Sequence, residues 1–246
     1  MDKMLYVAMT GASETMQAQA VKANNLANVT TPGFRAQFEQ QRAMPVYGTG
    51  FPSRVYAATE SPGHDFSPSA AQQTGNPLDV ALQGEGWLAV LGADGTEAYT
   101  RRGDLKINID GLLVTGAGDI VLGGGGPIAM PPARSVTIVD DGSINITPLA
   151  GDPTVNVTID QLKLVNPDVN GLYQREDGLF ANTNGLIAEA DVNVRVKAGM
   201  LESSNVNAVG ELIDLISLAR KHELDVKMMR KAEENDQTTA RLLQLS

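Results

Sequence analysis

Hydrophobic and small residues recur with a helical period at both ends of the chain. Near the N-terminus they fall mostly three or four positions apart, at Met1, Leu5, Ala8, Ala12, Met16, Ala20, Ala23 and Ala27. This spacing places them on one face of a helix, so we predict a helix over residues 1–28. We expect it to end near Asn28, because Thr31-Pro32-Gly33 cannot continue a helix.

The N-terminal stripe is rich in alanine, which limits what it contributes within one chain. At about 25 cal/mol per Å² of buried apolar surface, small side chains stabilise a helix contact only weakly. Small side chains also allow neighbouring helices to approach closely. We therefore expect this helix to pack within an assembly of several helices.

The C-terminal region carries a second helical stripe, interrupted once at Glu223. It comprises Val209, Leu212, Ile216, Ala219, Val226, Met229 and Ala232, and Leu242, Leu243 and Leu245 close the chain. Asn205 or Asn207 is the expected N-cap. A helix from there to the end would hold roughly 40 residues and span about 60 Å. This length is typical of a coiled coil or of helical packing.

Prolines separate these two ends from the middle of the chain. All twelve lie between Pro32 and Pro167, so both ends are free of residues that break helices. Residues 29–73 hold five of the twelve and show no sustained period. We therefore interpret this segment as an extended, irregular arm.

Residues 74–198 have the pattern of a β domain. Turn-forming pairs stand at Asp94-Gly95, Asp110-Gly111, Asp141-Gly142, Asn170-Gly171, Asp177-Gly178 and Asn184-Gly185. Short apolar runs lie among them, over residues 88–91, 112–114, 120–122, 136–139, 155–159 and 162–165. This alternation predicts antiparallel strands joined by tight turns.

These segments together predict an α+β fold. Long N- and C-terminal helices form a coiled-coil-like stalk, and an antiparallel β-rich domain is inserted between them. The expected segments are an N-terminal assembly helix (1–28), an extended Pro-rich arm (29–73), the β-rich domain (74–198) and a C-terminal assembly helix (199–246).

Composition narrows the possible functions. The 246 residues include 19 basic and 29 acidic ones, a net charge of −10, which argues against nucleic-acid binding because such binding relies on Lys and Arg. The chain has no cysteine, which excludes disulfides, thiolate nucleophiles and zinc–thiolate sites. No apolar run is long enough to span a membrane, and the start lacks a basic segment followed by an apolar one. We therefore expect neither membrane insertion nor a cleaved leader.

Few residues are arranged for catalysis or ligand binding. The two histidines, His64 and His222, have no metal-ligand spacing. The glycine-rich stretch 116–126 lacks the Lys of a phosphate loop, and the adjacent Asp140 and Asp141 would point to opposite faces of a strand. We interpret these stretches as loops and turns, and predict no catalytic residues, no cofactor, no metal site and no enzymatic activity.

Four blocks of sequence resemble the family of flagellar rod and hook proteins. Residues 23–34, Ala-Asn-Asn-Leu-Ala-Asn-Val-Thr-Thr-Pro-Gly-Phe, closely resemble its N-terminal signature. The other blocks are residues 78–87, residues 99–105 with 110–114, and residues 199–206, which occur in the family's order. Within the family, the opening of the chain, residues 31–37 and residues 162–167 look most like the proximal-rod type.

The resemblance implies a structural subunit of the bacterial flagellar basal-body rod. Such subunits are exported unfolded by the flagellar type III apparatus and polymerise in the periplasm through their terminal helices. The resulting drive shaft transmits torque from motor to hook. The expected partners are other proximal and distal rod subunits, further copies of this chain and the export apparatus, with no nucleic acid and no membrane insertion.

The resemblance and the helical stripes together predict an assembly interface at the two ends of the chain, with the β domain as the outer layer. We expect this interface to comprise Leu5, Ala8, Ala12, Met16, Ala20, Ala23, Asn24, Asn25, Leu26, Ala27, Asn28, Thr31, Pro32, Gly33, Phe34, Leu201, Glu202, Ser204, Asn205, Val206, Val209, Leu212, Ile216, Ala219, Val226 and Met229. Asn24, Asn25 and Asn28 are expected to hydrogen-bond neighbouring backbone where the helix ends.

Other functions remain open at this point. A distal rod or hook-type subunit would share the architecture at another axial position. A free-standing β-rich binding module with dimerising helices would need a concave groove lined by aromatic side chains, although the chain has only five Tyr, five Phe and one Trp. An enzyme would need ionisable residues, distant in sequence, gathered in one pocket.

Overall fold

A computed structural model describes residues 4–45, 55–149 and 155–244. The chain divides into two compact units. The helical unit comprises residues 1–29, 36–65 and 206–246, and the β unit comprises residues 30–35 and 66–205. The predicted stripe positions Met1 and Leu245 lie outside the described residues.

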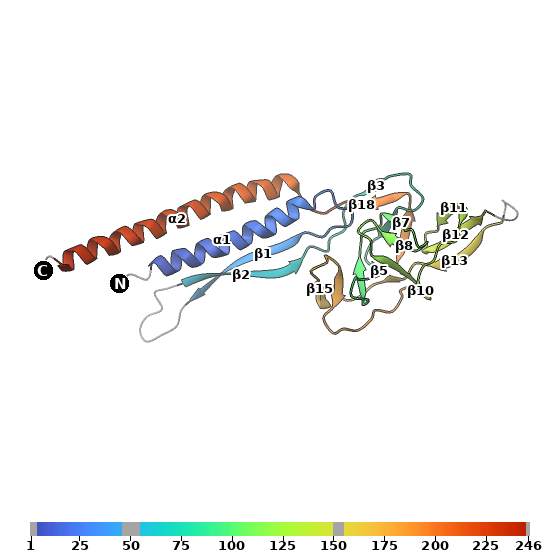
Figure 1. Ribbon diagram of the computed structural model, residues 1–246, viewed down its shortest axis with the longest axis horizontal. Coiled ribbons are helices and arrows are strands. Elements are labelled where there is room, and N and C mark those ends of the chain that lie inside the picture. Colours follow the sequence, from blue (N-terminus) through green and yellow to red (C-terminus); the bar gives the residue numbers. More distant parts are fainter. Residues whose placement is uncertain (1–3, 46–54, 150–154, 245–246) are drawn as a thin grey trace. The chain divides into compact units, whose positions relative to one another are not determined.

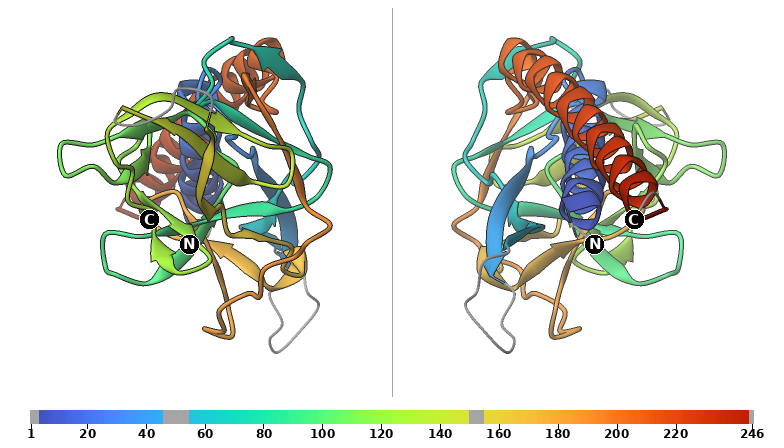
Figure 2. Two further views of the ribbon diagram at one scale, coloured as in Figure 1. Left: turned by 90° about the vertical axis from the view of Figure 1, so that its right-hand side faces the viewer. Right: turned by 90° about the vertical axis from the view of Figure 1, so that its left-hand side faces the viewer.

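Two long helices form most of the helical unit, and they run side by side in opposite directions (Figures 1 and 2). They are α1 (Met4–Ala27) and α2 (Ala208–Gln244). Both predicted helices are confirmed, and α1 ends next to the expected Asn28. At the start of α2, Oδ1 of Asn207 accepts a hydrogen bond from the amide of Gly210 at 3.2 Å. Asn207, and not Asn205, is therefore the N-cap.

A two-stranded antiparallel hairpin lies against α1 in the helical unit (Figure 1). Its strands are β1 (Gln37–Pro45) and β2 (Val55–His64), with Gln37 opposite His64 and a bulge between Phe38 and Gln40. The prediction of an irregular arm was wrong for these residues. Prolines are tolerated in edge strands, which have no neighbouring strand on one side. The sequence of the hairpin is polar and gives no strand signal of its own, and its strands pack against α1.

The β unit is built from antiparallel strands, as predicted, with its main sheet in the order β15-β16-β6-β5-β9-β8-β7. In that sheet β10 also pairs with β9 and β14 with β5, and smaller sheets are β11-β12-β13, β17-β4 and β18-β3. The strands are β3 (Ala71–Gln73), β4 (Val80–Gln83), β5 (Trp87–Leu91), β6 (Glu97–Thr100), β7 (Leu105–Ile107), β8 (Leu113–Thr115), β9 (Ile120–Gly123), β10 (Gly126–Pro127), β11 (Ala133–Ile138), β12 (Ser143–Pro148), β13 (Val157–Gln161), β14 (Leu164–Val165), β15 (Leu172–Gln174), β16 (Phe180–Asn182), β17 (Arg195–Ala198) and β18 (Met200–Glu202).

Large apolar side chains fill the interior of the β unit. One cluster gathers aliphatic residues from most strands, with Leu88, Leu113 and Ile144 fully buried. A second cluster is aromatic: the ring centroids of Trp87 and Phe180 are 4.9 Å apart, and Phe66 meets both rings edge-on. The unit therefore holds a hydrophobic core of its own.

The predicted turns explain how the short strands are connected. Five of the six Asp-Gly or Asn-Gly pairs place glycine at positive φ, namely at Gly95, Gly111, Gly142, Gly178 and Gly185. The sixth differs, because Asn170-Gly171 belongs to the short 3₁₀ helix η1 (Val169–Gly171), whose N-cap is Asp168. The glycine-rich stretch forms the turns on either side of β9, and Asp140 and Asp141 lie within the β11–β12 turn, both as interpreted.

The order of helix, β-rich middle and helix confirms the α+β class. A coiled-coil-like stalk remains a prediction. Within the part of the chain that the structure describes, neither helix has a stretch long and apolar enough to cross a membrane.

Candidate assembly surface

Small and polar side chains form the buried face of α1. Ala8, Ala12, Thr15 and Ala18 are at most 6% exposed, whereas Met16 is 59% exposed. The buried positions recur every three or four residues, so they share the face of α1 that packs inside the unit. Four large apolar side chains of α1 lie instead on its surface, namely Leu5, Tyr6, Met9 and Met16.

The same division holds for α2. Val209, Leu212, Ile213 and Ile216 are 68%, 51%, 61% and 49% exposed. Their spacing of three, four and seven residues gathers them in one stripe on the helix. The side of α2 turned toward α1 contains polar groups, because Glu211 and Asp225 contact α1 from there. The predicted C-terminal stripe therefore begins on the solvent-facing side of α2.

Asn25 joins the three elements of the helical unit. It is fully buried, and its amide exchanges two hydrogen bonds with the backbone of Gln37 on β1, both at 3.0 Å. Its Nδ2 also donates to Oε1 of Glu211 on α2 at 3.3 Å. Asn28 bonds the nearby carbonyl of Asn24 at 3.0 Å, as expected, but the local role predicted for Asn25 was wrong. Its side chain connects distant parts of the chain.

Lys22 forms a second polar connection between α1 and α2. Its Nζ lies 3.0 Å from Asp214 and 3.4 Å from Glu211. Burial alone would lower the pKa of Lys22, but its hydrogen bonds and attraction to these two carboxylates outweigh burial and raise it. Burial raises the pKa of Glu39 on β1, with Lys22 and Lys221 opposing that shift. The charged groups at this end of the unit are thus interdependent.

The polar contacts specify one alignment of the two helices. From the start of α1 onward, Thr15 contacts Asp225 at 3.4 Å, Lys22 contacts Asp214, and Asn25 contacts Glu211. Positions rise along α1 as they fall along α2, which is an antiparallel register. A shift of one turn would leave several buried polar groups without partners. Such groups fix a register at some cost in stability.

The structure distributes the predicted interface residues over three environments. Those at the surface are Leu5, Met16, Ala20, Ala23, Asn24, Ala27, Val209, Leu212, Ile216 and Ala219. Those partly exposed are Leu26, Asn28, Thr31, Pro32, Phe34, Leu201, Ser204, Asn205, Val206, Val226 and Met229. Those buried are Ala8, Ala12, Asn25, Gly33 and Glu202. The buried ones can support an interface only by holding the backbone around it.

Gly33 and Glu202 meet inside the β unit. Gly33 has φ +68°, and a Cβ at this position would collide with the carbonyl of Arg101. Its amide donates to the carbonyl of Glu202 at 2.8 Å, and the Glu202 side chain bonds Arg35 and Arg101. The Thr-Pro-Gly-Phe turn is therefore fastened to the lead-in of α2.

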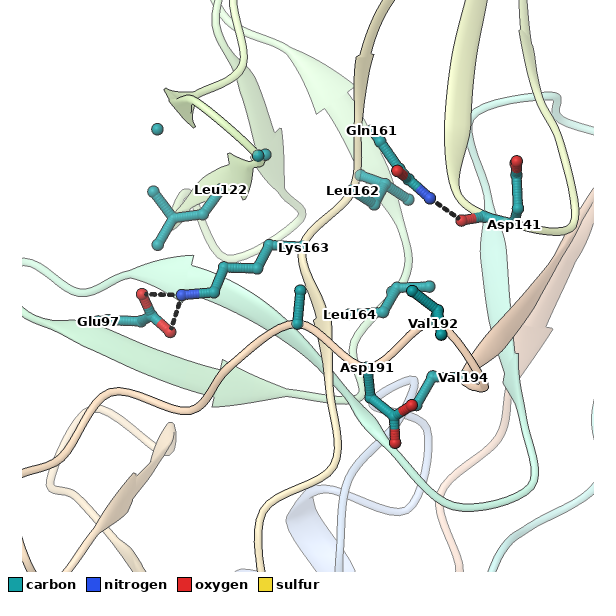
Figure 3. A pocket seen from close by; sticks show the side chains of 14 residues that line it. Glu97, Leu122, Asp141, Gln161, Leu162, Lys163, Leu164, Asp191, Val192 and Val194 are labelled. Atoms are coloured by element: carbon teal, nitrogen blue, oxygen red, sulfur yellow. Dashed lines mark hydrogen bonds and ion pairs between the residues drawn. The ribbon is translucent and has the colours of Figure 1, made fainter.

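The β unit also contains a cavity of about 330 Å³ (Figure 3). Leu122, Leu162, Leu164, Val192 and Val194 supply its apolar lining. Its one lysine, Lys163, points to Glu97 and bonds both carboxylate oxygens at 2.8 Å (Figure 3). The remaining polar groups are bound in turns, such as Asp141, whose pKa is lowered by the hydrogen bonds it accepts from Ser143. The charged groups named here are thus engaged in contacts within the β unit.

The residues weighed for chemistry lie apart. His64 ends β2 and His222 lies on α2. Over residues 4–45, 55–149 and 155–244, no three His, Asp or Glu side chains are grouped so as to hold a metal ion.

Several residues of this surface lie outside the stripes predicted from the sequence. Met9 on α1 and Ile213 on α2 are 54% and 61% exposed and flank the predicted stripes. Both residues directly follow a position of a predicted stripe, so a stripe one residue wider would have included them. The polar pairs of Lys22 and Asn25 had no such signal, because partners about 190 residues away cannot be read from spacing.

Comparison with known families finds matches in three separate parts of the chain. "Flagella basal body rod protein" matches residues 5–35, "Flagellar hook protein FlgE/F/G D1 domain" matches residues 81–146, and "Flagellar basal body rod FlgEFG protein C-terminal" matches residues 197–242. The three matches cover α1, the centre of the β unit and most of α2.

Individual relatives match over their full length. The chain is 42% identical to the flagellar basal-body rod protein FlgF of Escherichia coli (strain K12) and 40% identical to that of Salmonella typhimurium, with 100% of both chains covered in each case. It is 33% identical to the flagellar basal-body rod protein FlgG of Agrobacterium fabrum, over 94% of this chain and 95% of the relative.

Proposed function

The chain belongs to the FlgF-type flagellar basal-body rod proteins, and from this membership we infer that it is a structural subunit of the bacterial flagellar rod. The full-length similarity to two FlgF proteins carries this conclusion. The family is a structural one, and we propose that this member has no enzymatic activity. A free-standing binding module is not favoured, because the family matches include both helices as well as the β unit.

We propose that subunits assemble through the terminal helices, which pack into a coiled-coil-like stalk. The support is the placement of side chains: the apolar stripe of Leu212 and Ile216 faces solvent, and so does Met16 on α1. Exposed apolar stripes of this kind are typical of surfaces that meet another protein. Burial against a neighbouring subunit would stabilise the assembly by about 25 cal/mol per Å² of apolar surface.

We further propose the division of labour predicted from the sequence. Residues 1–28 and 199–246 act in assembly, residues 29–73 act as an arm with a hairpin, and residues 74–198 form the outer layer. The proposed partners are other proximal and distal rod subunits, further copies of this chain and the flagellar type III export apparatus. The basal body is the site of action, and the proposed position is the part of the rod in the periplasm, where the rod transmits torque to the hook.

Substitutions in the α2 stripe test this proposal. Leu212→Asp or Ile216→Asp places a charge on the exposed apolar stripe, and we expect loss of rods and of swimming while the β unit stays folded. Asn235→Asp is the matched control, because it adds the same charge at an exposed position of α2 outside the stripe. Normal rods built from Leu212→Asp or Ile216→Asp protein, seen by electron microscopy of basal bodies, would contradict assembly through this stripe.

A further inference from the structure

The chain passes between its two units at four places, after residues 29, 35, 65 and 205. We call each of these crossings a pass, and each pass is adjacent in sequence to a short segment of the β unit. Residues 33–35 lie between the first two passes, residues 67–69 follow the third, and residues 202–205 precede the fourth. All three segments meet at one buried carboxylate, that of Glu202.

Glu202 accepts hydrogen bonds from two of these segments and from Arg101, which directly follows β6. Its Oε1 accepts from Nη2 of Arg35 at 2.8 Å and from the amide of Ser69 at 2.9 Å. Its Oε2 accepts from Nε of Arg101 at 2.7 Å. The side chains of Glu202, Arg35 and Arg101 are 3%, 0% and 4% exposed, so these bonds form away from solvent.

Each of the two guanidinium groups also bonds a further part of the β unit. Arg35 donates from Nη1 to the carbonyl of Ser67 at 2.6 Å, which ties the second pass to the third. Arg101 donates to the carbonyls of Gly84 and Gly86, both at 2.9 Å. These carbonyls belong to the connection from β4 to β5, so Arg101 ties the carboxylate to the frame of the β unit.

Burying charged groups costs free energy, because they lose their hydration. Well-packed apolar residues of similar volume often stabilise a protein as well as a buried ion pair does, or better. A buried charge network adds geometric definition, because guanidinium and carboxylate groups bond only in specific orientations. The gain at this site is therefore a defined position of the segments that carry the four passes.

We propose that Glu202, held by Arg35 and Arg101, is a positioning residue that anchors all four chain passes at one site in the β unit. Force that enters from the helical unit is then shared among the passes. The mechanical consequence rests on the proposed function as a rod subunit, whereas the anchor itself is a property of the isolated chain.

Amide hydrogen exchange of the isolated chain carrying Glu202→Gln tests the anchor. The reporters are the amides of Gly33, Ser69 and Ser203, which bond across the anchored segments. We expect their exchange to accelerate at least about tenfold, through local opening. The amides of Ala89 and Leu113, which bond within the β core, should change by less than about twofold.

A matched variant controls for the loss of a buried carboxylate. Glu97→Gln removes the partner of Lys163 in a largely buried ion pair elsewhere in the β unit, and it should leave the exchange of the reporter amides unchanged. If Glu202→Gln does not fold, Arg101→Lys keeps the charge but loses the donors to Gly84 and Gly86. It should then accelerate the same reporters.

Two outcomes would overturn the anchor. One is wild-type exchange at Gly33, Ser69 and Ser203 in the variant, and the other is equal acceleration of these and the core amides, which means a merely structural role. Both outcomes are measured on the isolated chain and do not depend on whether it assembles into rods. Absence of the wild-type chain from rods would contradict the proposed function and leave the anchor standing.

Discussion

The helical unit and the β unit place their large apolar side chains in opposite locations. In the β unit, residues such as Leu88, Leu113 and Ile144 are fully buried. In the helical unit, the buried positions are taken by alanine, Thr15 and Asn25, while Met16 and the α2 stripe face solvent. The β unit therefore has a hydrophobic core of its own, whereas the helical unit leaves several of its large apolar side chains exposed.

The contrast indicates where each unit obtains its stability. Burial of large side chains contributes most of the favourable free energy of folding, and the β unit achieves it within one chain. The helical unit relies on polar contacts that fix its register, with a modest net contribution from each. In the proposed assembly, its apolar stripes would add to its stability once another subunit covers them.

The largest expected effect comes from truncating one apolar residue in each unit. Leu88→Ala should lower the free energy of unfolding of the β unit by about 2–5 kcal/mol, because it leaves a cavity. Ile216→Ala, at an exposed position, should change the stability of the isolated chain by no more than about 0.5 kcal/mol. Urea unfolding followed by the fluorescence of Trp87, the single tryptophan, reports on the β unit, and unfolding followed by circular dichroism of the helices reports on the helical unit. Equal losses in both variants would remove the contrast.

A smaller effect is expected from the polar register of the helical unit. Asn25→Ala removes the hydrogen bonds of Asn25 to the Gln37 backbone and to Oε1 of Glu211, which should cost about 1–3 kcal/mol. Circular dichroism of the helices should show the loss, while the Trp87 transition stays in place. Asn24→Ala is the control, because that side chain is exposed. If both variants melt alike, Asn25 does not fix the register.

The smallest effect is the pH dependence of the same unit. Burial raises the pKa of Glu39 above its ordinary value of 4.5, so the folded state holds this proton more tightly than the unfolded state. The contribution of Glu39 to the stability of the helical unit should therefore be fully present below pH 4.5, and it should be lost as the pH rises through the folded pKa of Glu39. Comparison with Glu39→Gln in helix melts isolates this group. A variant with the same pH profile as the wild type would show that Glu39 does not contribute.

The sequence predicted those parts of the fold that have a local signal. Both helices, the Asp-Gly turns at Gly95 and Gly111, and the apolar strand runs follow from period and turn chemistry. The β1–β2 hairpin had no such signal, because its polar strands form against α1 rather than around a core of their own. At Asn170-Gly171 the local signal predicted a hairpin turn, but these residues belong to a 3₁₀ helix capped by Asp168.

The candidate surface was only partly predictable for the same reason. Helical spacing found apolar stripes, but spacing alone does not say which stripe a helix buries within its own chain. In α1 the buried face turned out to run through Thr15 and Asn25, which left Met16 and Ala23 at the surface. The connections of Glu202 to Arg35 and Arg101 join residues 167 and 101 positions apart, which no local pattern can indicate.

Thiol labelling tests most directly whether the exposed α2 stripe becomes covered in the rod. The chain has no cysteine, so Ile216→Cys introduces a single reactive thiol at the stripe. Its labelling by a maleimide is compared between the isolated chain and purified basal bodies, with mass spectrometry to identify the chain in the rod fraction. We expect rapid labelling in the isolated chain and protection in the rod. Equal labelling in both, or absence of the chain from the rod, would contradict the account.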